Sequence, residues 1–182
     1  MANAITSCDV AQLYAVITAR IHAAFPALQT VEFDREDRDV LPVPACLLEI
    51  GEADDGQDPG SEQQCMDVRF SAQFVVGYRS LTARREVIQL AMAFAAFLRA
   101  QGRWPGIGGQ GGEPRIIGCY PDEFDPQLDK YDVWRVEWHQ SLWFGKSVWD
   151  WPNIPLPEHV HLGRAPDVGI GNEDKYTEVT NG

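Results

Sequence analysis

The chain has no long run of apolar residues and no excess of basic charge. No stretch approaches the roughly 18 apolar residues that a membrane-spanning helix needs, so we predict no such helix. Lys and Arg number 15 against 27 Asp and Glu, a net charge of −12. This balance argues against general nucleic-acid binding and against a membrane surface as partner. The start, MANAITSCDV, lacks the basic and then apolar layout of a signal peptide, so we expect a reducing cytoplasm as the compartment.

Motifs of zinc ribbons, nucleotide sites and hydrolases are also missing. The cysteines form no C-x-x-C pair, which argues against a zinc ribbon and against a disulfide scaffold. The string GIGGQGG has the spacing G-x-G-x-x-G, but we expect a helix before it and a strand after it, the reverse of a dinucleotide site. A P-loop and a G-x-S-x-G sequence do not occur. We therefore predict no catalytic residues, no bound cofactor and no enzymatic activity.

Two groups of residues have side chains suited to metal binding. His159 and His161 form H-V-H, but they lie in a proline-rich segment without the rigid support that ligands need, so we predict no metal site. A group of acidic residues after position 121 lacks the glycine and glutamate spacing of a calcium loop, which favours a solvated turn. Its members are Asp122, Glu123, Asp125 and Asp129.

Apolar periodicity predicts two helices and a set of strands, and 45 % hydrophobic residues are enough for a core. Helices are expected over 9–25 and from about 80 to 101, and strands over 29–33, 45–51, 68–78, 114–120 and 133–144. An acidic loop is expected at 52–64 and a glycine-rich loop at 102–113. This order favours an α+β fold, in which a mainly antiparallel sheet carries two helices packed on one face. After Gly145 the periodicity stops and prolines recur, so we divide the chain into a domain at 1–144 and an extended C-terminal arm at 145–182.

The expected strand with the clearest pattern, 68–78, alternates between apolar residues and a more polar set, so one face lies in a core and the other largely in water. Its polar side offers Arg69 and Gln73 as candidates for a subunit interface. Tryptophans are also concentrated, with five between positions 134 and 151. Because tryptophan is enriched both in cores and in interfaces, we leave both roles open for Trp143, Trp149 and Trp151, which complete the candidate interface set.

The stretch from Asp122 to Asp150, DEFDPQLDKYDVWRVEWHQSLWFGKSVWD, resembles the C-terminal half of tail terminator proteins of Mu-like and related long-tailed bacteriophages. The most specific parts are the F-D-P turn, the Y-x-V-W-R-V-E-W-x-Q strand and the G-x-S-V-W-D exit. The N-terminal half is similar in layout, from a first amphipathic helix through the strands P-V-P-A-C-L-L-E-I and R-F-S-A-Q-F-V-V-G-Y-R to a second helix.

The resemblance implies an α+β sheet with flanking helices and a structural role in the virion. Proteins of that family assemble as a ring, typically hexameric, that caps the tail tube, stops its polymerisation and forms the head–tail joining surface. The implied partners are other copies of the chain, the tail tube protein and the head–tail connector or stopper protein. Genomic DNA passes through the lumen without specific binding. The implied location is the neck of the virion, after assembly in the host cytoplasm.

Alternative functions remain at this point. Another neck component, such as a head-completion or connector-stopper protein, would share the assembly role. A metal-dependent enzyme that uses His159 and His161 is the remote alternative. The acidic loop at 52–64 would either line the lumen, where it repels phosphates, or lie outside as a solubilising segment.

Overall fold

The computed structural model describes residues 10–34, 40–58, 60–78, 80–104, 111–122, 128, 130–145, 147–148 and 161–179. The chain divides into two compact units, unit 1 at 1–149 and unit 2 at 150–182. The backbone N–H of Val148 donates to the carbonyl of Ser61 over 3.0 Å, which ties residue 148 to unit 1. The sequence boundary that we drew, between 144 and 145, lies just before this contact.

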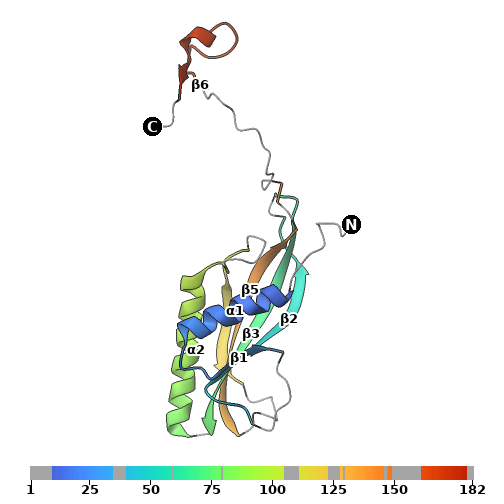
Figure 1. Cartoon of the computed structure of the whole chain (residues 1–182), viewed down its shortest axis with the longest axis vertical. Coiled ribbons are helices and arrows are strands. Elements are labelled where there is room, and N and C mark those ends of the chain that lie inside the picture. Colours follow the sequence, from blue (N-terminus) through green and yellow to red (C-terminus); the bar gives the residue numbers. More distant parts are fainter. Residues whose placement is uncertain are drawn as a thin grey trace. The chain divides into compact units, whose positions relative to one another are not determined.

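Unit 1 is built on one mixed sheet. Its described elements are α1 (Val10–Ala24), β1 (Thr30–Phe33), β2 (Ala45–Asp55), β3 (Gln64–Tyr78), α2 (Leu81–Gln101), β4 (Arg115–Pro121) and β5 (Tyr131–Phe144). The strand order is β1-β2-β3-β5-β4 (Figure 1). β1 pairs with β2 in parallel, and the remaining pairs are antiparallel. The α+β class predicted from the sequence is confirmed.

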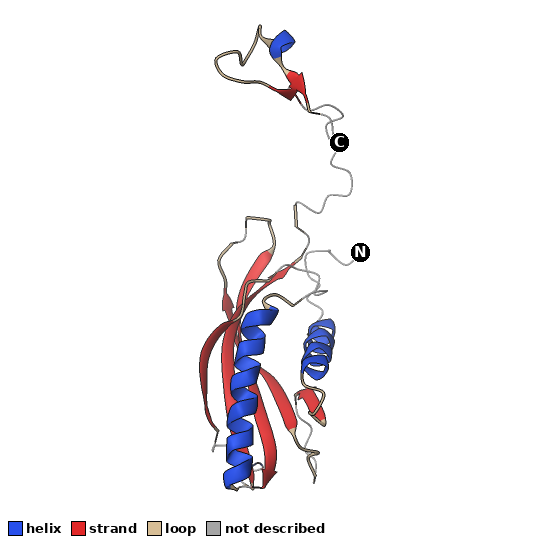
Figure 2. Ribbon diagram, turned by 90° about the vertical axis from the view of Figure 1, so that its left-hand side faces the viewer, coloured by secondary structure: helices blue, strands red, loops and turns tan. Residues whose placement is uncertain are grey.

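The two helices lie differently on the strands. α2 packs on β3, β5 and β4 and runs along them, whereas α1 packs on β1 and runs across the sheet (Figures 1 and 2). The hydroxyl of Ser80 caps α2 by accepting from the N–H of Ala83. Gly102 ends the helix with a φ of 63°, a conformation that glycine adopts without strain. No helix in the described ranges is long and apolar enough to cross a membrane.

One buried cluster joins both helices to a single face of the sheet. α1 contributes the spaced residues Leu13, Ile17 and Ile21, as its periodicity predicts. At the centre, Phe70 of β3 stacks on Trp138 of β5 with 5.2 Å between ring centroids. Phe94 of α2 packs on Trp138 at 5.7 Å and on Phe74 at 4.9 Å. Trp138 is therefore a core residue, held between the sheet and α2.

On the opposite face of the sheet, which we call the open face, the described residues form a buried apolar cluster at one end. Leu41 and Leu128 pack there on residues that start β2 and β5 and end β3. The members of this second cluster are Leu41, Ala45, Leu47, Val75, Leu128 and Val133. Beyond it, the open face carries the polar side chains of Asp67 to Gln73 on β3 and of Arg135 to Ser141 on β5.

The strands on either side of the acidic loop are longer than we predicted. β2 continues to Asp55 and β3 begins at Gln64, so the expected loop at 52–64 contracts to the connection between these two strands. The register shifts between Ile50 and Glu52, and from Gly51 to Asp55 the strand is exposed. Its hydrogen bonds to β3, rather than burial, hold this part of β2 extended, and hydropathy carries no signal of such pairing.

Unit 2 contains a small hairpin of its own. β6 (His161–Leu162) pairs with antiparallel β7 (Thr177–Glu178), and a 3-10 turn, η2, spans Glu173–Lys175. Tyr176 organises the loop, because its hydroxyl accepts from the N–H of Gly169 over 2.8 Å. A Cβ atom at Gly163 would approach the Tyr176 ring to 2.5 Å, so this position requires glycine.

Replacement of the central aromatic of α2 tests the core assignment. We expect Phe94→Ala to lower the free energy of unfolding by about 3–5 kcal/mol, since it leaves a cavity between α2 and the sheet. Met92→Ala, an exposed change on the same helix, should alter it by no more than about 0.5 kcal/mol. Urea unfolding followed by tryptophan fluorescence measures both variants. Equal stability of the two variants would contradict the packing of α2 on this face.

Candidate functional site

The open face brings together polar side chains from β3, β5 and the end of β4. Antiparallel pairing places Arg69 opposite His139, Ser71 opposite Glu137 and Gln73 opposite Arg135. These positions alternate with the apolar residues of the main core, as strand geometry requires. The candidate interface residues Arg69 and Gln73 therefore lie on the same face of β3, with Ser71 between them.

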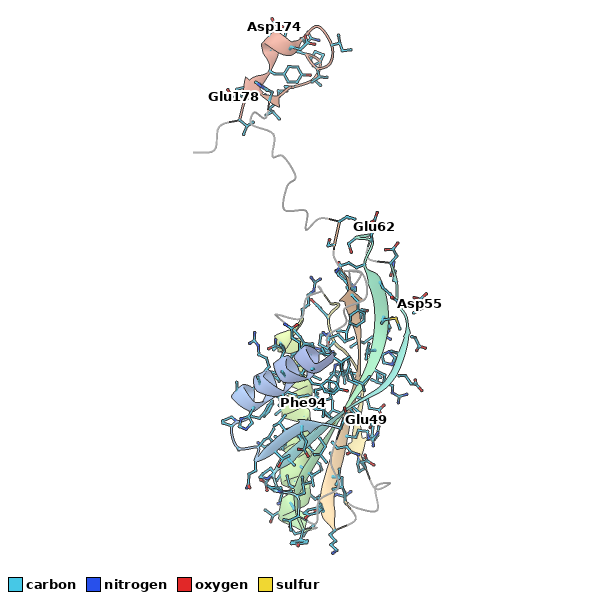
Figure 3. The ribbon with its side chains drawn as sticks, turned by 45° about the vertical axis from the view of Figure 1, so that its right-hand side comes forward. Glu49, Asp55, Glu62, Phe94, Asp174 and Glu178 are labelled. Carbon is cyan, nitrogen blue, oxygen red and sulfur yellow. The ribbon has the colours of Figure 1, made fainter. Side chains whose placement is uncertain are left out.

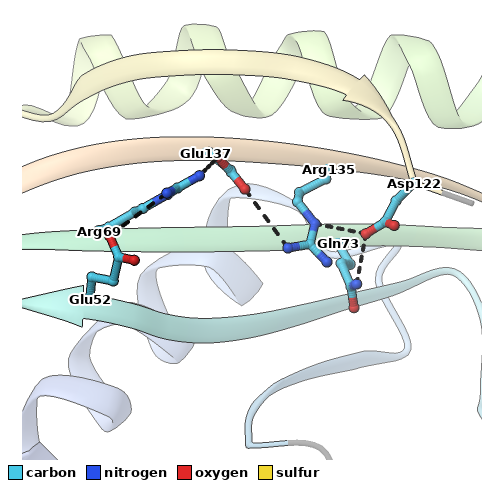
Figure 4. Close-up of polar contacts among 6 residues, drawn as sticks. All are labelled: Glu52, Arg69, Gln73, Asp122, Arg135 and Glu137. Atoms are coloured by element: carbon cyan, nitrogen blue, oxygen red, sulfur yellow. Dashed lines mark hydrogen bonds and ion pairs between the residues drawn. The ribbon is translucent and has the colours of Figure 1, made fainter. Parts of the chain in front are cut away.

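A chain of ion pairs and hydrogen bonds links five of these residues (Figure 4). Arg69 Nη2 donates to Glu137 Oε2 over 2.6 Å, and Arg135 Nε donates to Asp122 Oδ2 over 2.7 Å. Gln73 Nε2 donates to the same Asp122 oxygen over 2.8 Å. Arg135 Nη1 lies 3.8 Å from Glu137 Oε1 and connects the two halves. We call Arg69, Gln73, Asp122, Arg135 and Glu137 the polar network.

Asp122 differs from the sequence prediction. We expected it in a solvated turn, but its side chain is 3 % exposed and accepts from both Arg135 and Gln73. Its own backbone N–H donates to the carbonyl of Val133, which holds the end of β4 against β5. The prediction failed because the partners that bury Asp122, Gln73 and Arg135, come from other strands. Glu123, Asp125 and Asp129 lie outside the described residues.

The electrostatics of the network centre on Glu137, whose side chain is 7 % exposed. Burial alone raises the pKa of this carboxyl, but hydrogen bonds from Tyr120 and Arg69 outweigh burial, and the folded pKa lies below its usual range. Burial raises the pKa of Tyr120, and the hydrogen bond to Glu137 raises it further. The network is therefore a set of fixed charges that bond mainly to one another, and not a group poised to transfer protons near neutral pH.

Polar contacts continue along the open face beyond the network. Ser141 donates to Asp67 across the β3–β5 pair. Arg69 Nη1 also lies 3.8 Å from Glu52 Oε2, and this ion pair extends the polar contacts to β2. Glu49 and Asp55 also lie on β2 (Figure 3). Negative charge thus gathers on the β2 side of unit 1.

The tryptophan candidates are only partly described. Trp143 lies half-buried on β5, opposite Cys65, and the guanidinium of Arg103 is 6.0 Å from its ring centroid. The structure therefore gives Trp143 partners within its own chain but does not join it to the polar network. Trp149 and Trp151 lie outside the described residues.

The histidine pair of the sequence is likewise described in part. His161 starts β6 opposite Glu178, and His159 lies outside the described residues. Within the described ranges, no group of three or more His, Cys, Asp or Glu residues is placed to hold a metal ion. A small open pocket occurs near the N-terminus of α2, where Arg84 and Trp134 are among its lining residues.

Sequence reasoning identified one strand of the polar network and missed the other. It singled out Arg69 and Gln73, whereas Arg135 and Glu137 carry as many of the bonds. The alternation of β5 placed both residues on a polar face, but nothing in the sequence fixes the register between β3 and β5. That register decides which arginine meets which carboxylate.

Acidification tests the charge state of Glu137. A depressed folded pKa stabilises the fold above the unfolded value, and this contribution is lost as the pH falls through the folded value. We expect the free energy of unfolding to decrease at pH values below about 4, where carboxylates take up protons. At neutral pH, the free energy of unfolding of Glu137→Gln should be about 1–3 kcal/mol lower than that of wild type. On acidification, this free energy should decrease less for the variant than for wild type.

Urea unfolding across the acid range measures this difference, with Glu86→Gln on the exposed side of α2 as the matched control. An acid profile of Glu137→Gln that matches wild type would contradict the role of this ion pair.

Comparison with known proteins adds no assignment for these residues: no protein-family model matches the chain, and no curated protein matches it.

Proposed function

We propose that this chain is a structural virion protein, the tail terminator whose ring caps the tail tube of a long-tailed phage. The observation that carries the proposal is the resemblance of residues 122–150 to the terminator family, on a chain with the fold type that the resemblance implies. In this role several copies, typically six in that family, stop tube polymerisation and form the surface that the head connector binds.

The most specific motif of the resemblance coincides with the strand that organises unit 1. The sequence Y-x-V-W-R-V-E-W-x-Q is Tyr131 to Gln140 of β5. Its arginine and glutamate belong to the polar network on the open face. Its second tryptophan, Trp138, is buried in the main core, and Gln140 accepts from Trp104 over 2.7 Å. These four residues of the motif therefore each have a structural role in a sheet with flanking helices.

A terminator needs a subunit whose sides differ, because each added tube ring recreates the same open end. Unit 1 has this asymmetry. The helices and the main core lie on one face, and fixed charges lie on the other. Its negative charge also supports a lumen that repels DNA phosphates while the genome passes.

The internal bonding of the polar network changes how the candidate interface is tested. Arg69 and Gln73 are held by Glu137 and Asp122. Replacement of either one by glutamate would break a buried contact as well as alter a surface. Such variants therefore report on folding and on assembly together, and a test of assembly needs residues without buried partners.

Loss of the chain from its phage tests the function directly. We expect abnormally long tails, since nothing would then cap the growing tube, and electron microscopy of lysates measures their length. Complementation with the intact chain is the control. Tails of normal length beside unattached filled heads would instead assign the chain to the connector or head-completion role, and normal infectivity would exclude both roles.

Removal of unit 2 tests the interface role of the C-terminal arm. A chain without residues 150–182 keeps both helices and the five-stranded sheet. We expect its urea midpoint to match wild type while complementation fails. Normal tails from the truncated chain would show that the arm is dispensable, and a lowered midpoint would show that it belongs to the fold of unit 1.

A further inference from the structure

A small pocket of unit 1 opens between the start of α2 and the place where the end of β4 pairs with β5. Pro121 and Trp134, which are opposite each other in the β4–β5 register, line it together with Tyr131. Arg84, in the first turn of α2, lines it from the helix. The pocket therefore brings two aromatic residues and a proline together with one arginine.

Large apolar side chains are exposed beside this pocket. Tyr131 stacks on Tyr78, the last residue of β3, with 5.6 Å between ring centroids, and Tyr78 is 71 % exposed. Leu81, the first residue of α2, is 80 % exposed. Large apolar side chains that are exposed together, next to a pocket, are typical of a docking surface.

The charges at the pocket favour an acidic ligand. Arg84 is exposed and has no ion-pair partner among the described residues. The two carboxylates of the lining are already engaged, since Asp122 belongs to the polar network and Asp132 accepts from the N–H of Ser80 over 3.1 Å. A ligand that carries a carboxylate can therefore pair with Arg84.

The chain itself contains a segment with matching chemistry. Residues 149–158 read WDWPNIPLPE, with prolines at 152, 155 and 157, two acidic residues and no basic one. The first two of these prolines have the spacing P-x-x-P. Segments of this type bind aromatic-lined surfaces, because proline restricts the chain before it binds. We call residues 152–157, which lie outside the described ranges, the proline segment.

The proline segment is too close to the start of β3 to fill the pocket of its own copy. Val148 is bonded to the connection that precedes β3, whereas the pocket residue Trp134 is opposite Phe74, far along that strand. The ten residue steps from Gln64 to Phe74 span about 33 Å at the rise of a strand. The seven steps from Val148 to Pro155 span at most about 25 Å. The pocket is therefore left to a segment from another copy.

We propose that the proline segment of one copy binds the pocket at the start of α2 in a second copy, with its flanking acidic residues beside Arg84. The contact joins two different surfaces, so each copy offers a segment to one neighbour and a pocket to the other. Repetition of such a contact with a fixed rotation closes a ring. This inference rests on the proposed function and names the contact between its subunits.

Two variants of the full-length chain, each with one side of the contact removed, test it. The pocket variant is Arg84→Glu with Trp134→Ala, and the segment variant is Pro152→Ala with Pro155→Ala. We expect each to weaken self-association at least about tenfold. Their equimolar mixture should form dimers and nothing larger, because the intact segment of one variant fills the intact pocket of the other and the remaining pair is disabled. Sedimentation equilibrium measures the masses.

Matched substitutions separate the contact from effects on folding. Arg85→Glu changes the next residue of α2, which does not line the pocket, and Pro26→Ala changes an exposed proline elsewhere, so both should associate like wild type. Arg84→Glu alone, at an exposed position, should weaken association and leave the urea midpoint unchanged.

Each other outcome overturns the contact. Pocket and segment variants that associate like wild type, or a mixture that stays monomeric, would exclude this pair of surfaces. A wild-type chain that is monomeric at its highest soluble concentration also excludes it. A pocket variant that self-associates normally but no longer binds tail tubes would assign the pocket to the tube protein instead. The proposed function fails separately, through tails of normal length joined to heads in the absence of the chain.

Discussion

The structure depends on the antiparallel pairing of β3 with β5. This pairing runs from Gln64 opposite Phe144 to Tyr78 opposite Tyr131, nearly the whole length of both strands. It stacks Phe70 on Trp138 on one face and sets Arg69 beside Glu137 on the other. Because side chains alternate between faces, one register satisfies the core and the polar network together.

Helix α2 and the polar network stabilise opposite faces of the same pair of strands. α2 supplies apolar contacts through Phe94, which need no particular orientation of charge. The network instead requires each donor to meet its acceptor, since a buried carboxylate without a partner costs free energy. The helix therefore covers the apolar face of this pair of strands, and the charged face favours one register over its alternatives.

Periodicity was enough to predict the fold class and both helices, because those features depend on neighbours along the chain. The helical spacing of apolar residues in α2 and the alternation of β3 are clear in the sequence itself. The extension of β2 through its acidic residues was not predicted, because only pairing with β3 holds it. Only part of the polar network was predicted, for a similar reason. Arg69 and Gln73 stand on an evident polar face, but the burial of Asp122 depends on a contact with β5.

The alternation of β5 has a consequence for how this sequence tolerates insertions. One added residue in the middle of β5 would turn Trp138 toward water and Glu137 toward the aromatic core. The connection between β2 and β3 can change length without such an inversion, since the strands on both sides keep their pairing. A tag or a label therefore belongs near Asp58, whereas β3 and β5 must vary by substitution alone.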